Sequence, residues 1–523
     1  MDWAEGYFTG LDYTFGYYRE LNPAMLRIAC LAAGVVPPYS ESPTYLELGF
    51  GQGVSLNVHA AASEGEFWGT DLNPGQVAHA SGLADVSGAE LSLFDESFEE
   101  FARRSDIPLF DVIVLHGVWS WISEHNQSII TELVRKRLRP GGILFISYNC
   151  QPGWAPQMPL RHLMTQSIRS TGTESVGPIA RIDDALRYVR RVANSGAQYF
   201  EMNPSLAVHI ENMDSRSRNY LSHEYLNRDW HNVFFSDVAD RLSGAKLSFT
   251  TSARLLDNLE NQGMHPSARR ILEEAGHPVF RETVRDFIVN QRFRMDIFSK
   301  GTRRLTALEW RHSWLAESFM LTTPAPLIAY IHQAPMGELE LDERTYAPLI
   351  AFLASDGYAP KSVAEICETP AMASAELRDV LSALLTLTGL GHAQPARAPT
   401  ARVRRQTEAL NLHLCQRAIS ADQLPALASP VLAGGVLVSQ EQQMILLAKL
   451  AGMDTPADQA FYLHSIFEAN GGDLRRDGES ISKGEEALEH FRASAAKFQS
   501  NGHAELFAAL EVIPPRPPSL AAA

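Results

Sequence analysis

Cysteine is scarce in this sequence, and the spacing of the few cysteines excludes two kinds of structure. The chain has 523 residues and four cysteines, Cys30, Cys150, Cys367 and Cys415. No two of them form a C-x-x-C pair, so the sequence predicts neither a zinc site nor a disulfide framework. Free thiols are typical of a reducing cytoplasm. We therefore expect no metal centre.

Long apolar runs and a basic leader are missing as well. No stretch approaches the ~20 apolar residues that a helix needs to span a bilayer. The first residues, from Met1 to Gly6, are acidic where a signal peptide would be basic. These two features predict a soluble cytoplasmic protein that does not insert into a membrane.

Basic residues are outnumbered by acidic ones, 45 to 61, which gives a net charge of −16. Non-specific binding of nucleic acid needs a basic surface, so the charge predicts no nucleic-acid partner. It mildly favours basic partners, although acidity that only aids solubility explains it equally well. A chain of this length is too long for one core, and about three or four domains are expected.

A glycine-rich turn between a predicted strand and a predicted helix is the most informative feature. The turn contains Glu47, Gly49, Gly51 and Gly53. Glycine at every second position lets the backbone turn sharply and approach a ligand where any Cβ would clash. A second predicted strand, 67–71, ends in Asp71, a carboxylate placed where α/β nucleotide folds bind ribose hydroxyls. The pattern predicts a nucleoside-bearing cofactor.

The residue after the turn separates two classes of cofactor. A nicotinamide fingerprint needs Gly or Ala at position 54, and the chain has Val54. The E-x-G-x-G-x-G spacing that begins at Glu47 instead resembles motif I of class I S-adenosylmethionine-dependent methyltransferases. This resemblance implies S-adenosylmethionine as the cofactor. The cofactor-binding residues that we expect from the turn and the resemblance are Glu47, Gly49, Gly51, Gly53, Asp71, Leu72, Asp95, Glu96 and His116.

Strands and helices alternate beyond the turn. Strands are predicted at 90–95, 110–115 and 143–148, with a helix over 127–138 and a returning strand at 246–250. This order is typical of a parallel, doubly wound sheet that binds ligands at the carboxyl ends of its strands. We predict an α/β, Rossmann-like class I methyltransferase domain with a seven-stranded, mostly parallel sheet. Mostly helical C-terminal domains are expected to follow it.

Candidate catalytic residues follow the fourth and fifth strands. They are His116, Trp119, Trp121 and Tyr148. Two tryptophans at a strand end are costly to expose, so they line either a pocket or a domain interface. For His116 the alternative is a residue that caps the strand and touches only cofactor, and for Tyr148 it is packing within the sheet. Tyr18 is a further candidate wall residue, and Asn149 and Glu224 are candidate polar groups.

Several runs resemble bacterial methyltransferases that carry the methyltransferase regulatory domain. These runs are 116–122, 139–142, 148–154, 223–227 and 286–298. The resemblance covers roughly residues 10 to 305 well and the remainder loosely. That group includes protein-lysine methyltransferases acting on bacterial outer-membrane proteins, which implies a lysine-bearing protein substrate. The leader at 17–21 differs from the proline-rich leader of the group, and this departure bears on substrate choice.

Two other functions would use the same cofactor motifs. A small-molecule N- or O-methyltransferase would have a closed pocket with no surface for a polypeptide. A non-catalytic S-adenosylmethionine-binding regulator would have His116 and Trp119 blocked from solvent. A nucleotide-sugar or nicotinamide enzyme is disfavoured by Val54.

Composition and pattern also divide the chain into expected domains. We expect the helical insertion, residues 155–222, to act as a substrate cap or a homodimer contact. The other expected parts are an aromatic N-terminal lid (1–40), the cofactor-binding catalytic domain (41–154 and 223–252), a helical regulatory-type segment (253–305), a winged-helix-like middle domain (306–395), a C-terminal domain (396–513) and a disordered tail (514–523).

Overall fold

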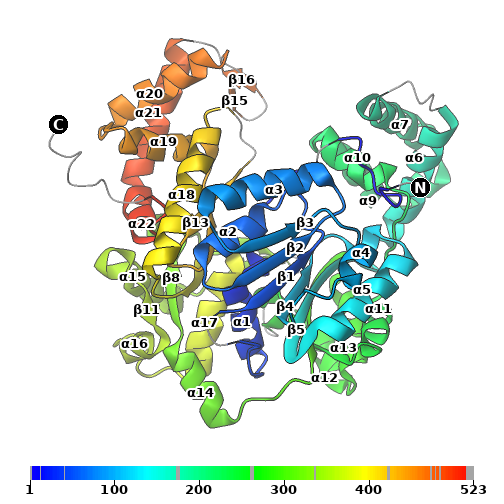
Figure 1. Ribbon diagram of the computed structural model, residues 1–523, viewed down its shortest axis with the longest axis horizontal. Coiled ribbons are helices and arrows are strands. Elements are labelled where there is room, and N and C mark those ends of the chain that lie inside the picture. Colours follow the sequence, from blue (N-terminus) through cyan, green and yellow to red (C-terminus); the bar gives the residue numbers. More distant parts are fainter. Residues whose placement is uncertain are drawn as a thin grey trace.

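A seven-stranded sheet lies at the centre of the computed structural model (Figure 1). The structure describes residues 3–11, 13–39, 42–171, 177–259, 264–334, 337–420, 424–471, 474–476, 479–481 and 484–513. The strands are β1 (Thr44–Leu48), β2 (Glu66–Thr70), β3 (Leu91–Phe94), β4 (Phe110–Leu115), β5 (Leu138–Asn149), β6 (Leu247–Ser252) and β7 (Phe293–Lys300). The expected tail, 514–523, lies outside the described residues.

The strand order β3-β2-β1-β4-β5-β7-β6 defines the fold. Strands β1 to β5 pair in parallel, and β7 runs antiparallel to both β5 and β6. Every residue of β4 is buried, because helices cover both faces of a parallel sheet. The predicted Rossmann-like class I methyltransferase fold is confirmed. The helices that pack around the sheet include α2 (Val54–Ala62), α3 (Pro74–Ser87), α4 (Phe98–Arg103), α5 (Glu124–Arg137) and α11 (Phe235–Ser243).

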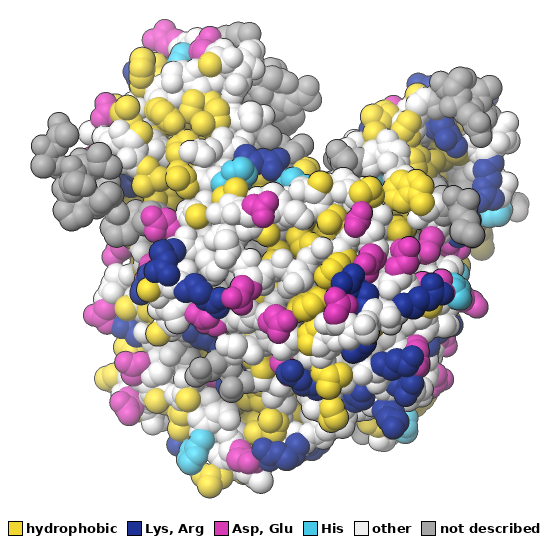
Figure 2. Space-filling view, in the orientation of Figure 1, with side chains coloured by type: hydrophobic (Ala, Val, Ile, Leu, Met, Phe, Trp, Pro, Cys, Tyr) yellow, Lys and Arg dark blue, Asp and Glu magenta, His cyan; other side chains and the backbone are white. Residues whose placement is uncertain are grey.

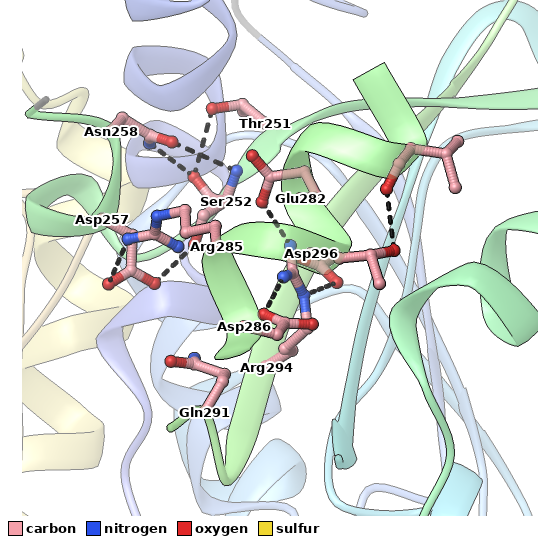
Figure 3. Close-up of polar contacts among 12 residues, drawn as sticks. Thr251, Ser252, Asp257, Asn258, Glu282, Arg285, Asp286, Gln291, Arg294 and Asp296 are labelled. Atoms are coloured by element: carbon pink, nitrogen blue, oxygen red, sulfur yellow. Dashed lines mark hydrogen bonds and ion pairs between the residues drawn. The ribbon is translucent and has the colours of Figure 1, made fainter. Parts of the chain in front are cut away.

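Strand β7 corrects one expectation, because it lies in the segment 253–305 that we expected to be helical. Its apolar residues Phe293, Met295 and Ile297 alternate with Arg294 and Asp296, and both of these charged residues are buried as well. Arg294 pairs with Asp296 at 2.8 Å and with Asp286 at 2.5 Å (Figure 3). It also pairs with Glu282 at 2.8 Å. These ion pairs join β7 to helix α13 (Pro278–Val289), and only the folded chain brings their members together.

The helical insertion forms a lobe of its own, which we call the cap lobe (Figure 1). It contains η3 (Ala155–Gln157), α6 (Met158–Thr171), α7 (Pro178–Ala193), α8 (Gln198–Met202), α9 (Ser205–Asp214) and α10 (Arg218–Leu226). Its apolar side chains form a separate core that extends from Leu160 to Tyr225. Helix α10 therefore belongs to the cap lobe, whereas our expected boundary fell within that helix, at residue 222.

The N-terminal segment lies across the carboxyl ends of the strands and leads into η1 (Arg19–Leu21) and α1 (Pro23–Ala32). The Tyr18 N–H donates to Ser55 Oγ at 2.9 Å, and the Arg19 guanidinium donates to the carbonyl oxygens of Thr388 and Gly389. The segment is thus fixed between the cofactor turn and a distant helix. The short helices η2 (Trp119–Trp121) and η4 (Leu255–Asn258) and helix α12 (Pro266–Glu274) complete this half.

The stretch 306–395, expected to be winged-helix-like, contains helices packed on a small sheet of order β11-β8-β12. One hydrophobic core runs from Leu21 to Val512, so these later parts pack directly on the catalytic domain. The elements of this half are α14 (Ala307–Ala316), β8 (Ser318–Leu321), η5 (Ala325–Leu327), β9 (Ile331–Ala334), β10 (Gly337–Glu340), α15 (Glu343–Tyr358), β11 (Lys361–Ser362), α16 (Val363–Glu368), α17 (Leu377–Leu390), β12 (Ala393–Ala396), α18 (Ala401–Arg417), β13 (Ala426–Ser429), β14 (Gly434–Leu437), α19 (Gln440–Leu450), α20 (Pro456–Ala469), β15 (Leu474–Arg476), β16 (Glu479–Ile481), α21 (Glu485–Ser500) and α22 (His503–Ala509).

The surface view shows a wide hollow between the cap lobe and the C-terminal helices, above α3 (Figure 2). Within the described part of the chain, no helix has both the length and the apolar character needed to cross a membrane.

Candidate functional site

A cavity of about 760 Å³ opens at the carboxyl ends of the parallel strands. Three parts of the chain line it: the N-terminal segment, the sheet edge and the cap lobe. Ligands of doubly wound α/β folds bind at this edge. The cavity is therefore the candidate active site, and its position between the lobes follows from the fold.

The glycine turn forms the floor of the cavity. A Cβ at Gly49 would lie 2.6 Å from Val118 Cγ2, and one at Gly53 would lie 2.5 Å from Ala80 Cβ, so packing excludes side chains at both positions. Gly51 differs, since its added Cβ would meet only Tyr13 Cδ1 at 3.8 Å. Its φ of 59° is one that side-chain-bearing residues rarely adopt. The backbone at Gly51 thus faces the cavity without any atom in between.

Asp71 is held against this turn at the end of β2. Its Oδ2 accepts the Gly51 N–H at 2.8 Å, and its Oδ1 accepts the Asn73 N–H at 2.9 Å. Burial raises the pKa of Asp71 to about 6, although these two hydrogen bonds oppose the shift. The carboxylate is thus oriented toward the cavity, and its second lone pairs suit a vicinal diol such as ribose.

Two other carboxylates of the cavity have an oxygen without a partner. Glu47 Oε2 is buried and accepts no hydrogen bond from the described residues, and the same is true of Glu96 Oε2. Burial raises the pKa of Glu47 to about 8. A buried acceptor without a donor is costly, so each position suits a ligand that donates. An ammonium group at Glu47 and an amino group at Glu96 fit the methionine and adenine ends of S-adenosylmethionine.

His116 lies where the floor meets the rest of the cavity. Its Nδ1 is 3.0 Å from Ser147 Oγ, which itself accepts the Gly117 N–H at 2.8 Å. Ser147 thus links His116 Nδ1 to the backbone of Gly117. Burial lowers the pKa of His116 to about 4, so the ring is neutral near pH 7. The Tyr18 ring packs on it, with the centroids 4.1 Å apart.

Tyrosine side chains and one carboxylate form a further part of the cavity, the tyrosine end, which reaches the glycine turn at Tyr13. The tyrosines are Tyr7, Tyr13 and Tyr18 from the N-terminal segment and Tyr220 from the cap lobe. Burial raises the pKa of Tyr13 well above its usual value, and the nearby Tyr18, Tyr7, Glu224 and Tyr220 add to the shift. These hydroxyls therefore stay protonated and lie close together, as donors and acceptors in an apolar surrounding.

Glu224 is the carboxylate of this end. Burial raises its pKa to about 7, whereas a hydrogen bond with the Tyr220 hydroxyl and the charges of Arg161 and Arg216 oppose the rise. A carboxyl group with this pKa exchanges a proton readily near neutral pH. The cavity thus contains a proton acceptor close to the tyrosines that line it.

The cavity brings most of the predicted site residues together, but not all. Leu72, Trp121 and Asn149 line it, as do all the residues described above for the turn and for Glu224. Trp119 does not line it, because its side chain is buried in the core that contains β4 and β5. Tyr148 is buried too, and its hydroxyl donates to Asp296 at 2.6 Å. Asp95 is exposed and lies outside the cavity lining, while its neighbour Glu96 lines it.

Our expectation for Trp119 and Tyr148 as cavity walls is therefore corrected. Trp119 belongs to η2 and packs into the core beside β4 and β5, whereas Tyr148 of β5 points into the packed sheet layer toward Asp296. Sequence reasoning also missed several residues of the lining. They are Tyr7, Tyr13, His209, Arg216, Tyr220, His223, Arg254 and Arg292. The aromatic density near the N-terminus was a signal for the first two, but no local pattern marked the cap residues.

The fold and this site define a class I S-adenosylmethionine-dependent methyltransferase. Comparison with known families agrees: a methyltransferase domain model matches residues 46–142. A second model, described as a predicted methyltransferase regulatory domain, matches residues 217–300. The chain is 34% identical to protein sll1526 of Synechocystis over 507 residues, which span 96% of this chain and 98% of that protein. It belongs to the family of methyltransferases that carry this regulatory domain.

Two further comparisons extend across the family. Protein RP028 of Rickettsia prowazekii is 30% identical over 234 residues, covering 43% of this chain and 88% of that protein. The solved structure of PKMT2 from Rickettsia typhi in complex with AdoHcy has the same fold, with a TM-score of 0.66. Its sequence is 20% identical, and the match covers 95% of this chain and 98% of that one. The likeness in fold thus includes the cap lobe and the C-terminal half.

Proposed function

We propose that the protein methylates lysine side chains of a protein substrate, with S-adenosylmethionine as the methyl donor. The observation that carries the proposal is Glu224, which lines the cavity together with four tyrosines and has a pKa of about 7. An amine acceptor is a cation at neutral pH, with a free pKa of about 10.4 for lysine, and must lose a proton before it attacks. The resemblance to a group that includes protein-lysine methyltransferases supports the same substrate class.

In this proposal the chain itself binds, orients and deprotonates the acceptor. Glu47, Asp71 and Glu96 would hold the cofactor, which when bound supplies a methyl group on a sulfonium and leaves as the neutral thioether. The lysine ammonium enters among the rings of Tyr13, Tyr18 and Tyr220, whose faces tolerate a cation. Its proton passes to a Glu224 carboxylate oxygen, and the freed nitrogen lone pair forms the new bond to the methyl carbon.

Two further contacts favour transfer over binding alone. The Tyr18 ring lies on the His116 imidazole, which is neutral, so this histidine adds no positive charge that would repel the incoming ammonium. The N-terminal segment and the cap lobe close the cavity from two sides, which removes water from the reacting atoms. Exclusion of water strengthens the attraction between the ammonium and Glu224.

A labelling experiment tests the proposal. The protein is incubated with methyl-labelled S-adenosylmethionine and with soluble and membrane fractions of a bacterial extract. The control is the variant Gly51→Val, in which a side chain obstructs the glycine turn. We expect wild-type protein to transfer label to polypeptides, on lysine after hydrolysis, and the variant to transfer none. Label in small molecules alone would replace the proposal with a small-molecule methyltransferase. Cofactor binding without any transfer would instead favour a regulator.

A further inference from the structure

Two arginines of the cavity lining have no acidic partner. Arg292 lies over the ring of Trp154, 4.8 Å from its centroid, and Arg216 lies over Tyr220 at 5.6 Å. Among the residues that the structure describes, neither guanidinium forms an ion pair or donates a hydrogen bond. Each thus presents its donors to the cavity while an aromatic face supports one side of the guanidinium plane.

The arginines around them behave differently. Arg218 pairs with Asp183 at 2.7 Å, and Arg190 pairs with Asp214. Arg161 lies over the ring of Trp230 at 4.5 Å, but it also donates to the carbonyl oxygens of Glu224 and Asn227. A chain with a net charge of −16 has ample carboxylates to pair its arginines. Other arginines, such as Arg191 and Arg241, also form no ion pair within the described part of the chain, but Arg216 and Arg292, together with Arg254, line the cavity.

The two free guanidinium groups converge on one part of the cavity. Burial, and then the positive charges of Arg292 and Arg216, lower the pKa of His209, which lines the same wall, to about 4. The charge of Glu224 interacts with that of Arg216, but the hydrogen bond of Glu224 is with Tyr220, and Glu5 accepts the Asn126 amide at 2.6 Å. Both arginines are exposed, so a substrate can reach them from the opening of the cavity.

We propose that Arg216 and Arg292 form a subsite for a carboxylate side chain of the substrate, so that the enzyme prefers acceptor lysines flanked by acidic residues. This rests on the proposed function and narrows its substrate class to acidic polypeptide segments. A guanidinium binds a carboxylate through two parallel hydrogen bonds, and the aromatic rings restrict its rotation beforehand. The preference would offset the general repulsion between an acidic enzyme and an acidic substrate.

Two synthetic peptides test the subsite. Both contain one lysine, flanked by glutamates in the first and by glutamines in the second, and methylation is followed by mass spectrometry. We expect the kcat/KM of wild-type enzyme to be about tenfold higher for the glutamate peptide than for the glutamine peptide, mostly because KM is lower. A tenfold difference corresponds to the free energy of one charge-assisted hydrogen-bonded pair. High salt should reduce this ratio, because both arginines are exposed to solvent.

The double variant Arg216→Gln, Arg292→Gln should bring the ratio between the two peptides to about one. Its matched control is Arg187→Gln, on the exposed face of α7 and paired with Asp184 outside the cavity, which should keep the tenfold ratio. Circular dichroism and S-adenosylhomocysteine binding establish that both variants are folded. Equal use of the peptides by wild-type enzyme, or an unchanged ratio in the double variant, overturns the subsite. Failure to methylate either peptide by cofactor-bound enzyme overturns the proposed function and, with it, the subsite.

Discussion

Replacing Glu224 with glutamine tests the proton transfer that the cavity supports. The amide keeps the size of the side chain and its hydrogen bond with Tyr220 but accepts no proton from an ammonium group. A positioned general base contributes about 10²- to 10⁴-fold to a rate, so we expect kcat to fall by about 10²-fold or more. Binding of S-adenosylhomocysteine should change little, because the groups proposed to hold the cofactor are Glu47, Asp71 and Glu96.

The pH dependence gives a sharper test than the rate alone. With a Glu224 pKa of about 7, the carboxylate fraction is about a tenth at one pH unit below and about nine tenths at one unit above. Lysine stays protonated over this range, so wild-type kcat/KM should rise about tenfold and then level off. In Glu224→Gln only the free amine reacts, and kcat/KM should keep rising about tenfold per pH unit.

The assay follows methylation of a lysine peptide at saturating cofactor across this pH range. Glu211→Gln, on the exposed side of α9, is the matched control and should retain the wild-type profile. Glu47, with a pKa of about 8, also titrates nearby, but its effect would persist in Glu224→Gln. The same slope for wild type and Glu224→Gln, without a plateau in either, would refute the role of Glu224.

Three further substitutions test the rest of the account. Gly51→Val should abolish binding of S-adenosylhomocysteine in calorimetry while the protein stays folded. The φ of residue 51 is 59°, which valine rarely adopts, and its side chain would enter the cavity. Retained affinity would contradict the role of the glycine turn in binding the cofactor. Tyr148→Phe should lower the free energy of unfolding by about 1–3 kcal/mol in urea, since Asp296 loses a buried donor, with little loss of kcat. A large loss of kcat without a change in the free energy of unfolding would show that Tyr148 acts in catalysis. Arg294→Met should lower the free energy of unfolding by about 3–5 kcal/mol, because buried carboxylates lose their partner; an unchanged melting curve would show that the cluster is not structural.

The sequence was sufficient for the first five strands and the cofactor turn because both depend on local patterns. Apolar runs such as 110–115 mark a strand covered on both faces, and the spacing from Glu47 to Gly53 marks a backbone turn against a ligand. Strand β7 was not predictable in the same way. Apolar residues do alternate along it, but the charged Arg294 and Asp296 between them are buried only because Glu282 and Asp286 of α13 pair with Arg294, which no local pattern shows.

The acceptor end of the cavity depends on tertiary structure in the same way. Strands β1 to β5 lie between Tyr13 and Tyr220 in the sequence, yet the two residues are neighbours in the cavity. Trp119 and Trp121 begin and end the short helix η2, and one of them lies in the core while the other lies in the cavity lining. Periodicity does not decide which tryptophan faces a ligand when the strand has just ended.

The most direct test of the central claim is the location of the transferred methyl group. Wild-type protein is incubated with trideuteromethyl-labelled S-adenosylmethionine and a purified polypeptide that took up label in the extract experiment, and fragmentation mass spectrometry locates the added mass. The account predicts the label on the ε-nitrogen of lysine, in wild-type reactions and not with Gly51→Val. Label on a carboxylate, a cysteine or a backbone position, or only in a small molecule, would contradict it.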